Sequence, residues 1–327
     1  MRRIGLFFLA ALFGFSCAAT TPMMAAPYQG AASCDETGRI LFADFSSRPA
    51  YIASVTKIMT ALLVLEDVRA KKYGFFDEVT ATDAARLSEP SWVGLRAGER
   101  MRVRDLLLAL MVESANDAAI VLAVHSAGSL EAFVRRMNAR AAALGMTKTL
   151  YFNPNGLPPN KSRHYPWTSF NVSTAEDQLK LACAILKYPE ILEFTSVKTA
   201  DLIKTPTGYR VNVTRQANRP ERTTRLGADE TLVKTFVNHN NVMVKDEQKV
   251  VSADGRECVD GLKTGYIEAG GSSVVLTARD KGRRVIVAVL GSDKRLDVKG
   301  RVLRKSSEVR DEEARQLLLD ALSSCAW

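Results

Sequence analysis

Ser54-Val-Thr-Lys57-Ile-Met-Thr-Ala-Leu-Leu-Val-Leu65 is the stretch that decides the fold of this chain. Its apolar residues recur at spacings near three and four, which predicts a buried helix. Residues three apart share one face of a helix, so the Lys57 amine can reach the Ser54 hydroxyl. A serine hydroxyl is a weak nucleophile until a base takes its proton, and lysine is such a base only when its pKa falls. The stretch therefore predicts an activated serine near the start of a buried helix.

A second short motif, Ser114-Ala-Asn116, follows an apolar run at residues 106–112. If the helix ends or turns there, the hydroxyl and the amide point into one cleft. The serine can then relay a proton to a leaving amine, and the asparagine can hold a substrate amide. Ser169-Phe-Asn171 fits the same S-x-N pattern, but it follows a proline in a loop and lacks the helical frame. We therefore favour Ser114.

The third motif, Lys263-Thr264-Gly265, lies in a predicted strand. Lys263 and Thr264 offer donors to a carboxylate, and Gly265 lets a substrate backbone approach closely. A strand edge at this point can pair with a substrate through main-chain hydrogen bonds. The backbone N–H groups of Ser54 and Tyr266 are candidates for an oxyanion hole.

The order of predicted elements indicates the fold class. Residues 28–45 predict a hairpin, and helices follow from about 55, over 102–124 and 130–144, and after Ser173-Thr174. Residues 202–214 can form a hairpin, and residues 215–230 predict an exposed loop. Three β-branched runs, at 258–262, 273–278 and 285–290, predict an antiparallel meander buried on both faces, and 308–322 predict a closing helix. This order is typical of an α+β fold with an antiparallel central sheet, flanking helices and an inserted all-α subdomain at about 70–190.

The N-terminus predicts export. Arg2 and Arg3 precede an apolar run at residues 4–15, which is the order of a secretory signal and is too short for a comfortable membrane span. We expect residues 1–26 to be a signal peptide and residues 27–327 to be one catalytic domain in the periplasm or cell envelope. Cleavage after 17–19 and after 24–26 both remain open. Residues 14–17 also resemble a lipoprotein signal, in which a lipid on Cys17 would tether the domain to a membrane.

The charge and the residue composition of the chain argue against several classes of function. The formal net charge is +9. An exported basic protein meets anionic envelope polymers and lipid head groups, so no nucleic-acid partner is expected. The three histidines, His125, His164 and His239, lie outside G-x-S-x-G and H-E-x-x-H contexts, which argues against a Ser-His-Asp hydrolase and a zinc site. We expect no metal and no organic cofactor.

Four cysteines follow the predicted signal peptide: Cys34, Cys183, Cys258 and Cys325. They allow three pairings between which the sequence does not choose. These cysteines are spaced more widely along the chain than those of a disulfide-rich scaffold. We therefore prefer the interpretation that all four are small buried side chains.

Taken together, the three motifs resemble the low-molecular-mass penicillin-binding proteins, the serine D-alanyl-D-alanine carboxypeptidases of the peptidase S11 type. The resemblance runs from about Tyr28 to Arg304. Lys299-Gly-Arg301 is similar to a family segment whose arginine binds the terminal carboxylate of the stem peptide. Further matching segments are Val103–Leu107, Phe152–Leu157, Ser173–Asp177 and Val259–Gly265.

The resemblance implies a β-lactamase/transpeptidase-like fold and a D,D-carboxypeptidase. The terminal D-alanine of a peptidoglycan stem would leave through an acyl-enzyme on Ser54, and β-lactams would acylate the same serine. The implied catalytic residues are Ser54, Lys57, Ser114 and Asn116, and the implied substrate-binding residues are Lys263, Thr264, Gly265, Tyr266 and Arg301.

The chain departs from the family pattern in two places. Only 26 residues follow Arg301, so we expect no C-terminal β-rich domain. Residues 198–254 contain an expected insertion, for which a loop near the cleft and an envelope contact are both open.

Three alternative functions compete with this interpretation. A D,D-endopeptidase of the same family, which cuts cross-links, would carry identical motifs. A class A β-lactamase needs a glutamate-activated water, and residues 151–167 offer no convincing glutamate. A non-catalytic peptidoglycan-binding protein on this fold has no need to keep the motif residues together.

Overall fold

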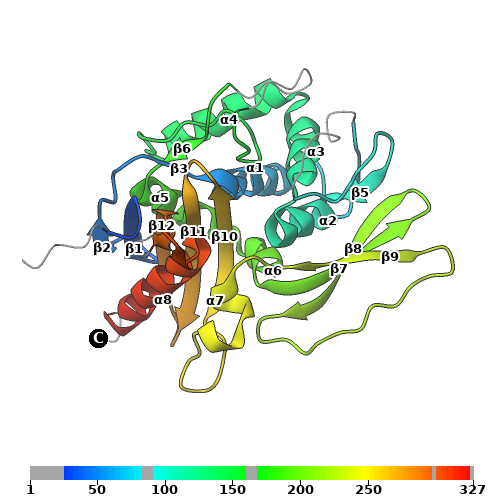
Figure 1. The fold of residues 1–327 in the computed structure, drawn as a ribbon. Helices are drawn as coiled ribbons and strands as arrows, with labels where there is room; N and C mark the ends of the chain where they lie inside the picture. The colour runs from blue at the N-terminus through cyan, green and yellow to red at the C-terminus, as the bar shows by residue number, and fades with distance from the viewer. Residues whose placement is uncertain (1–25, 83–90, 160–167, 297–299, 325–327) are drawn as a thin grey trace, which may run out of the picture.

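The computed structural model describes residues 26–82, 91–159, 168–296 and 300–324 (Figure 1). The predicted signal peptide, Cys17 and Cys325 lie outside these residues, apart from Ala26 at the end of the predicted signal. The main sheet has the strand order β10-β11-β12-β1-β2, and every neighbouring pair is antiparallel. The strands are β1 (Gly30–Asp35), β2 (Ile40–Asp44), β10 (Val259–Ile267), β11 (Gly271–Asp280) and β12 (Arg283–Ser292).

This sheet joins the two ends of the chain, because β1 pairs with β12 in register from Gly30 opposite Leu290 to Asp35 opposite Val285. The predicted N-terminal hairpin and C-terminal meander are therefore confirmed. Strand β10 contains the Lys263-Thr264-Gly265 motif, as predicted, and continues through Tyr266 to Ile267. As the edge strand of the sheet, it has one side without a neighbouring strand, and polar residues are tolerated there.

Helices cover both faces of the main sheet. On one face lies α8 (Ser306–Ser324), which crosses β11 and β12 and closes a small apolar core, as Figure 1 shows. On the other face lie α1 (Lys57–Arg69) and α5 (Ala175–Ile185), within the larger core. Successive residues of β11 alternate between the cores: Val274 and Leu276 contact the α8 side, and Val275 contacts the other. This is the burial on both faces that its β-branched sequence predicts.

The inserted part is mainly helical, but it also contains three strands that were not predicted, β4 (Glu78–Thr80), β5 (Arg100–Arg102) and β6 (Val172–Ser173). Strands β4 and β5 add to a second sheet, and a short pair joins β3 (Ala50–Tyr51) to β6. Among the described residues, this part contains α2 (Val103–Leu108), α3 (Asn116–Ala127), α4 (Leu130–Ala143), α5 and the 3₁₀ turn Pro189–Ile191, and α6 (Leu192–Thr195) follows it.

The predicted helix over 102–124 is broken in the middle. Helix α2 continues into a wider π-helical turn at Ala109–Glu113, which ends at Ser114 in the left-handed region (φ 63°). Helix α3 then starts at Asn116. Gly128 ends α3, and the Ser129 side chain caps α4 by accepting a hydrogen bond from the Ala132 N–H. The break places the second motif at a corner.

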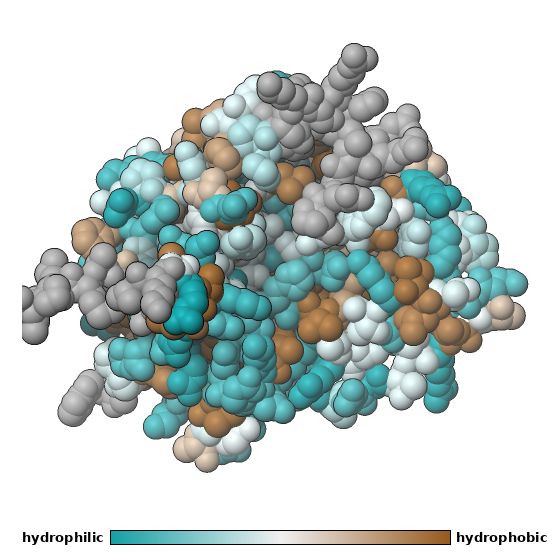
Figure 2. Space-filling view, viewed as in Figure 1, coloured by the Kyte–Doolittle hydropathy of each residue, from teal (hydrophilic) through white to brown (hydrophobic). Residues whose placement is uncertain are grey.

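The second sheet has the order β4-β5-β8-β7-β9. The predicted hairpin is confirmed as β7 (Val197–Thr205) and β8 (Gly208–Gln216), and 217–230 form a largely exposed connection. Strand β9 (Thr231–Val237) was not predicted. It is an edge strand that leaves Leu232, Val233 and Val237 exposed, and Figure 2 shows apolar residues gathered over this sheet. Three of its apolar residues are exposed and Phe236 is buried, so its sequence lacks the alternation of a half-buried strand.

The remaining elements connect β9 to the main sheet and β12 to α8. They are α7 (Asn241–Val244), the 3₁₀ turn Asp246–Gln248, β13 (Arg295–Leu296) and β14 (Val302–Arg304). No single helix in the described ranges is long and apolar enough to cross a membrane; α3 and α4 together pass such a test, and they meet at an angle of 86°. Cys34, Cys183 and Cys258 are free thiols.

Candidate active site

Ser54 lies on a 3₁₀ turn, Ala53–Thr56, that leads directly into α1. The α-helix therefore begins at Lys57, about two residues later than the pattern indicates. The predicted approach of the two side chains is confirmed, because Lys57 Nζ lies 2.9 Å from Ser54 Oγ. The serine is half-buried, and the lysine is fully buried. A nucleophile with one accessible side is thus backed by an amine without access to solvent.

Two carbonyl oxygens fix the direction of the Lys57 amine. Lys57 Nζ donates to the Asn116 side-chain oxygen and to the Asn155 backbone oxygen, both at 2.7 Å. Neither oxygen can donate a hydrogen bond, so a neutral Lys57 amine must donate its two hydrogens to these two oxygens. Its lone pair then faces the Ser54 hydroxyl, which is the arrangement a general base requires.

The charge state of Lys57 is set by its surroundings. Burial lowers the pKa of Lys57 well below its ordinary value, and the nearby Lys263 cation lowers it further, whereas Asp117 opposes both. A lowered pKa increases the fraction of Lys57 that carries a neutral amine. This is the condition under which Ser54 can lose its proton to Lys57.

The Phe152–Leu157 loop holds the Asn155 carbonyl in place. Thr60 of α1 donates to the Pro154 oxygen at 2.6 Å, and the Gly156 N–H donates to the Asn153 side chain at 2.6 Å. Gly156 has φ +84°, and a Cβ there would lie 1.9 Å from the Ala53 oxygen. Only glycine fits between this loop and the turn that carries the nucleophile.

The second S-x-N sequence supports the same loop. The Asn171 side-chain oxygen accepts from the Phe152 and Asn153 N–H groups, and its NH₂ group donates to Thr56 Oγ1 at 2.9 Å. Asn171 is therefore a structural residue behind the site. The choice of Ser114 over Ser169 agrees with its position, because Ser114 lines the same cavity as Ser54.

Helix α3 also anchors a wall of the site. The buried Asp117 carboxylate accepts hydrogen bonds from the N–H groups of Val93, Gly94 and Leu95. The Asn116 N–H donates to the Ser91 oxygen at 2.7 Å. These bonds hold residues 91–95 against the corner at Ser114.

Strand β10 forms the opposite wall. Lys263 is 2% exposed, and its amine donates to the Thr264 oxygen at 3.1 Å. Burial and the Arg310 cation lower the pKa of Lys263 to about 7, against the opposing effect of Glu113. Thr264 is buried at the cavity surface, and Tyr266 is exposed.

Gly265 has a second role that the sequence did not predict. A Cβ at this position would lie 2.7 Å from the Ile52 oxygen and 3.0 Å from the Ser54 nitrogen. The glycine therefore lets β10 pack against the turn that carries the nucleophile. The expected close approach of a substrate backbone stays a prediction.

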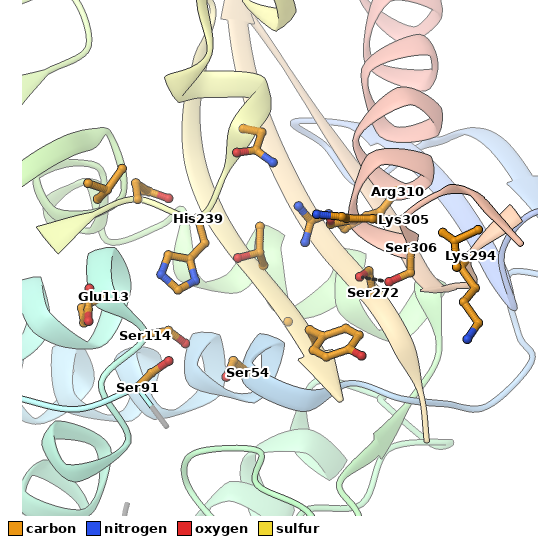
Figure 3. Close-up of a pocket in the computed structure, with 18 of the residues that line it drawn as sticks. Ser54, Ser91, Glu113, Ser114, His239, Ser272, Lys294, Lys305, Ser306 and Arg310 are labelled. Atoms are coloured by element: carbon orange, nitrogen blue, oxygen red, sulfur yellow. Dashed lines mark hydrogen bonds between the residues drawn. The ribbon is translucent and has the colours of Figure 1, made fainter. Parts of the chain in front are cut away.

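A cavity of about 1030 Å³ connects these walls. Ser54, Ser114, Thr264, Gly265 and Tyr266 line it directly. Lys57, Asn116 and Lys263 lie buried behind them. Figure 3 shows Ser54, Ser91 and Ser114 near one end, with Arg310, Lys305, Ser306 and Ser272 gathered near the start of α8.

The arginine that lines this cavity is Arg310, at 4% exposure on α8. Asp311 accepts hydrogen bonds from it at 2.6 and 2.8 Å. Arg301 is instead exposed on the connection between β12 and α8, outside the described residues that line the cavity. A signal for Arg310 was present, because it occupies the apolar face of α8 one turn before Ala314 and two turns before Leu318. Arginine is rarely buried unless it is paired, so an arginine on the buried face of a helix indicates a specific partner or function.

The end of β9 and the residues that follow it form another wall that the motifs do not indicate. Thr235, Val237, Asn238 and His239 line the cavity. Lys234 of β9 forms a 2.7 Å ion pair with Glu113 and donates to the Trp92 oxygen at 2.9 Å, which joins the second sheet to the turn before Ser114 and to the loop at 91–95. The stretch for which no role was assigned thus contributes to the cleft.

In the described ranges, no group of three or more His, Cys, Asp or Glu side chains is placed to hold a metal ion. The chemistry of the site rests on hydroxyls, amines, amides and one guanidinium.

A family model described as D-alanyl-D-alanine carboxypeptidase matches residues 31–237. The chain is 29% identical over 257 residues to D-alanyl-D-alanine carboxypeptidase DacF of Bacillus subtilis, covering 79% of this chain and 55% of the relative. It is 37% identical over 162 residues to a D-alanyl-D-alanine endopeptidase of Pseudomonas aeruginosa, covering 49% of this chain and 47% of the relative. The chain therefore spans about half the length of these curated relatives.

A solved structure of similar size also matches. It is penicillin-binding protein D2 of Listeria monocytogenes in its ampicillin-bound form, with a TM-score of 0.64 and 25% identity. The match covers 91% of this chain and 99% of that one. The α+β transpeptidase-like fold expected from the sequence is confirmed.

Proposed function

The chain belongs to the D-alanyl-D-alanine carboxypeptidase family, and from this premise we propose that it is a serine D,D-carboxypeptidase. Its substrate is the stem peptide of peptidoglycan, from which it removes the terminal D-alanine. One observation carries the proposal: Ser54 Oγ lies 2.9 Å from the buried Lys57 amine, at the edge of a cavity that the other two motifs also reach.

Acylation begins with the neutral Lys57. Its lone pair takes the Ser54 proton as the serine oxygen attacks the carbonyl carbon of the penultimate D-alanine. The backbone N–H groups of Ser54 and Tyr266 stabilise the negative charge that develops on the carbonyl oxygen. The substrate backbone lies along β10, because an edge strand has main-chain donors and acceptors to share.

Collapse of the tetrahedral intermediate releases D-alanine. The proton that Lys57 received returns to the leaving nitrogen through the Ser114 hydroxyl, which lines the cavity beside Ser54. Water then enters and hydrolyses the ester on Ser54, with Lys57 again accepting a proton. The Asn116 amide oxygen holds Lys57, while its NH₂ group donates to a substrate carbonyl.

The terminal carboxylate of the substrate binds at the α8 end of the cavity. Lys263, Thr264 and Arg310 provide positive charge and donors there. We assign to Arg310 the role that the family resemblance suggested for Arg301, because Arg310 lines the cavity. A guanidinium suits a carboxylate because it offers paired donors in one plane.

β-Lactams would acylate the same serine, since they place a strained amide and a carboxylate in the positions of the D-alanyl-D-alanine end. The similarity to penicillin-binding protein D2 in its ampicillin-bound form supports this. A classical β-lactamase would release the drug rapidly, whereas this site is expected to release it slowly.

D,D-endopeptidase activity is the second candidate, supported by the 37% identity to the Pseudomonas aeruginosa endopeptidase. The chemistry on Ser54 would be unchanged. The leaving group would then carry a further peptide, for which the cavity offers space past Arg310 towards Lys294 and Lys305.

Residues 1–26 act as a signal for export, and the protein works in the periplasm or cell envelope. Cys17 is either lipidated, which tethers the domain to a membrane, or lies in a segment that is removed. Incorporation of a labelled fatty acid into the protein in cells, compared with a Cys17→Ser variant, separates these two outcomes.

The test of function offers the purified protein a pentapeptide stem and a cross-linked dimer of stems. Free D-alanine from the first, absent with Ser54→Ala, supports the carboxypeptidase. Conversion of the dimer to monomers as the main reaction would favour the endopeptidase. Binding of either substrate without turnover by a folded protein would support a non-catalytic binder.

A further inference from the structure

Two cysteines far apart in the sequence face each other in the fold. Cys34 of β1 and Cys183 of α5 are separated by 149 positions, and their sulfur atoms lie 3.9 Å apart. Cys34 is fully buried, whereas Cys183 is partly exposed. Neither residue lines the active-site cavity.

The scaffold holds the two thiols in this relation. Helix α5 packs directly on β1 and β12, and Cys34 belongs to the large core with Ala182 of α5 and Ile286 of β12 as fellow members. Close packing fixes the backbones on both sides. The sulfur atoms need only approach from 3.9 Å to the ~2.0 Å of a disulfide, a change that side-chain rotation can supply.

Cys258 is not a competing partner in this fold. Its side chain belongs to the second core, on the α8 side of the main sheet, whereas Cys34 lies on the opposite side. The sheet therefore separates it from the pair. Of the three pairings open to Cys34, Cys183, Cys258 and Cys325, the geometry favours the one that joins the first two.

We propose that Cys34 and Cys183 form a disulfide that ties the first strand of the main sheet to the helical part of the molecule. The proposal rests on the proposed export, because thiols are kept reduced inside most cells and oxidised outside the cytoplasm. It replaces the interpretation of these two residues as isolated buried thiols.

Cys183 is the point of entry for the oxidant, which is a disulfide of a small thiol or of a protein. Its thiol is partly exposed beside the Asp35–Gly38 turn, and a Cβ at Gly38 would lie only 3.9 Å from its sulfur. A hydrogen bond from Cys34 and the Lys187 cation lower the pKa of Cys183, which favours its thiolate.

The electrons balance in two exchanges. The Cys183 thiolate attacks one sulfur of the external disulfide and releases one thiolate. Cys34 then loses its proton, attacks the Cys183 sulfur and releases the second thiolate. The protein loses two protons and two electrons, and the external disulfide is reduced to two thiols.

The bridge would close a long loop of chain and so restrict the unfolded state. We expect the oxidised protein to unfold at a temperature about 5 °C or more above the reduced protein. Acylation of Ser54 by penicillin should change less than about twofold, because the bridge lies away from the cavity.

The experiment treats the purified full chain with oxidised glutathione, blocks free thiols with iodoacetamide under denaturing conditions, and maps peptides by mass without reduction. A linked pair of peptides containing Cys34 and Cys183 supports the proposal. Alkylated Cys34 and Cys183, or a link from either to another cysteine, overturns it.

Matched variants guard against loss of folding. Cys258→Ser should keep both the linked peptides and the higher unfolding temperature in oxidant. Cys183→Ser, at the partly exposed position, should remove both while leaving penicillin acylation intact. If the disulfide forms but penicillin does not acylate the protein, the proposed function is wrong and the disulfide proposal is supported. If penicillin acylates the protein but the disulfide does not form, only the disulfide proposal is wrong.

Discussion

The Asn155 backbone oxygen lies 2.7 Å from the Lys57 amine, so a loop about one hundred residues further along the chain aims the base at the nucleophile. The Asn116 side-chain oxygen accepts a second hydrogen bond from the same amine. With both hydrogens of the neutral amine held, only the lone pair remains for Ser54. The direction of proton transfer is therefore built into the resting site.

Changing Asn116→Asp should slow acylation about 10- to 1000-fold at pH 7. A carboxylate beside Lys57 would raise the pKa of the amine and keep it protonated, so it could not accept the Ser54 proton. The rate of the variant relative to the native enzyme should recover at higher pH, where Lys57 of the variant also loses its proton. The measurement is the acylation rate with a fluorescent penicillin between pH 6 and 10. An equal loss at every pH would contradict the assigned role.

Gly156→Ala should abolish acylation, because its Cβ would lie 1.9 Å from the Ala53 oxygen and would displace either the loop or the nucleophile turn. Gly145→Ala is the matched control. Gly145 also has a positive φ, but its Cβ would meet nothing within 4 Å, so it should cost only about 1–2 kcal/mol of stability. Thermal unfolding and penicillin labelling distinguish the two. Equal effects of both variants would argue against the fit at Gly156.

The acylation rate should follow a bell-shaped pH profile. It rises with pH as Lys57 loses its proton, because the neutral amine is the base. It falls on the alkaline side as Lys263, whose pKa is lowered to about 7, loses the charge that binds the substrate carboxylate. In Lys263→Arg, a guanidinium stays charged to about pH 12, so the alkaline fall should disappear. A native profile that rises steadily to pH 10 would refute this role of Lys263.

Arg310→Ala should raise KM for a D-alanyl-D-alanine peptide about tenfold or more, while the matching Arg301→Ala variant should stay within about twofold of the native enzyme. The effect should shrink for a peptide whose terminal carboxylate is an amide, since the guanidinium then has no anion to bind. Initial rates of D-alanine release from carboxylate peptides provide the measurement, and binding by competition serves for the amide. A larger loss in Arg301→Ala would return the carboxylate role to Arg301.

Much of this site follows from short local patterns. The Ser54–Lys57 spacing fixes a contact within one turn, and the hydrophobic periods of the surrounding segments give the helices and the meander. The pattern places the start of the α-helix about two residues too early, because the 3₁₀ turn Ala53–Thr56 leads into α1 without a break and side chains three apart share a face in both. These parts can be predicted from local sequence because the residues that interact are close along the chain.

The remaining parts depend on contacts between distant segments. Nothing near Asn155 indicates that its carbonyl meets Lys57, and nothing in the exposed strand β9 indicates that it borders a cleft. The family segment Lys299-Gly-Arg301 points to Arg301, whereas the physical signal for Arg310 is a basic residue on the buried face of α8. Burial in the folded chain is what distinguishes the two arginines.

The most direct test of the central claim is the intact mass of the purified protein, and of Ser54→Ala, after incubation with a penicillin. We expect the native chain to gain the mass of one penicillin and the variant to gain none while retaining its fold. An unmodified native protein that is demonstrably folded, or an adduct that persists in Ser54→Ala, would contradict the assignment of Ser54 as the Lys57-activated nucleophile.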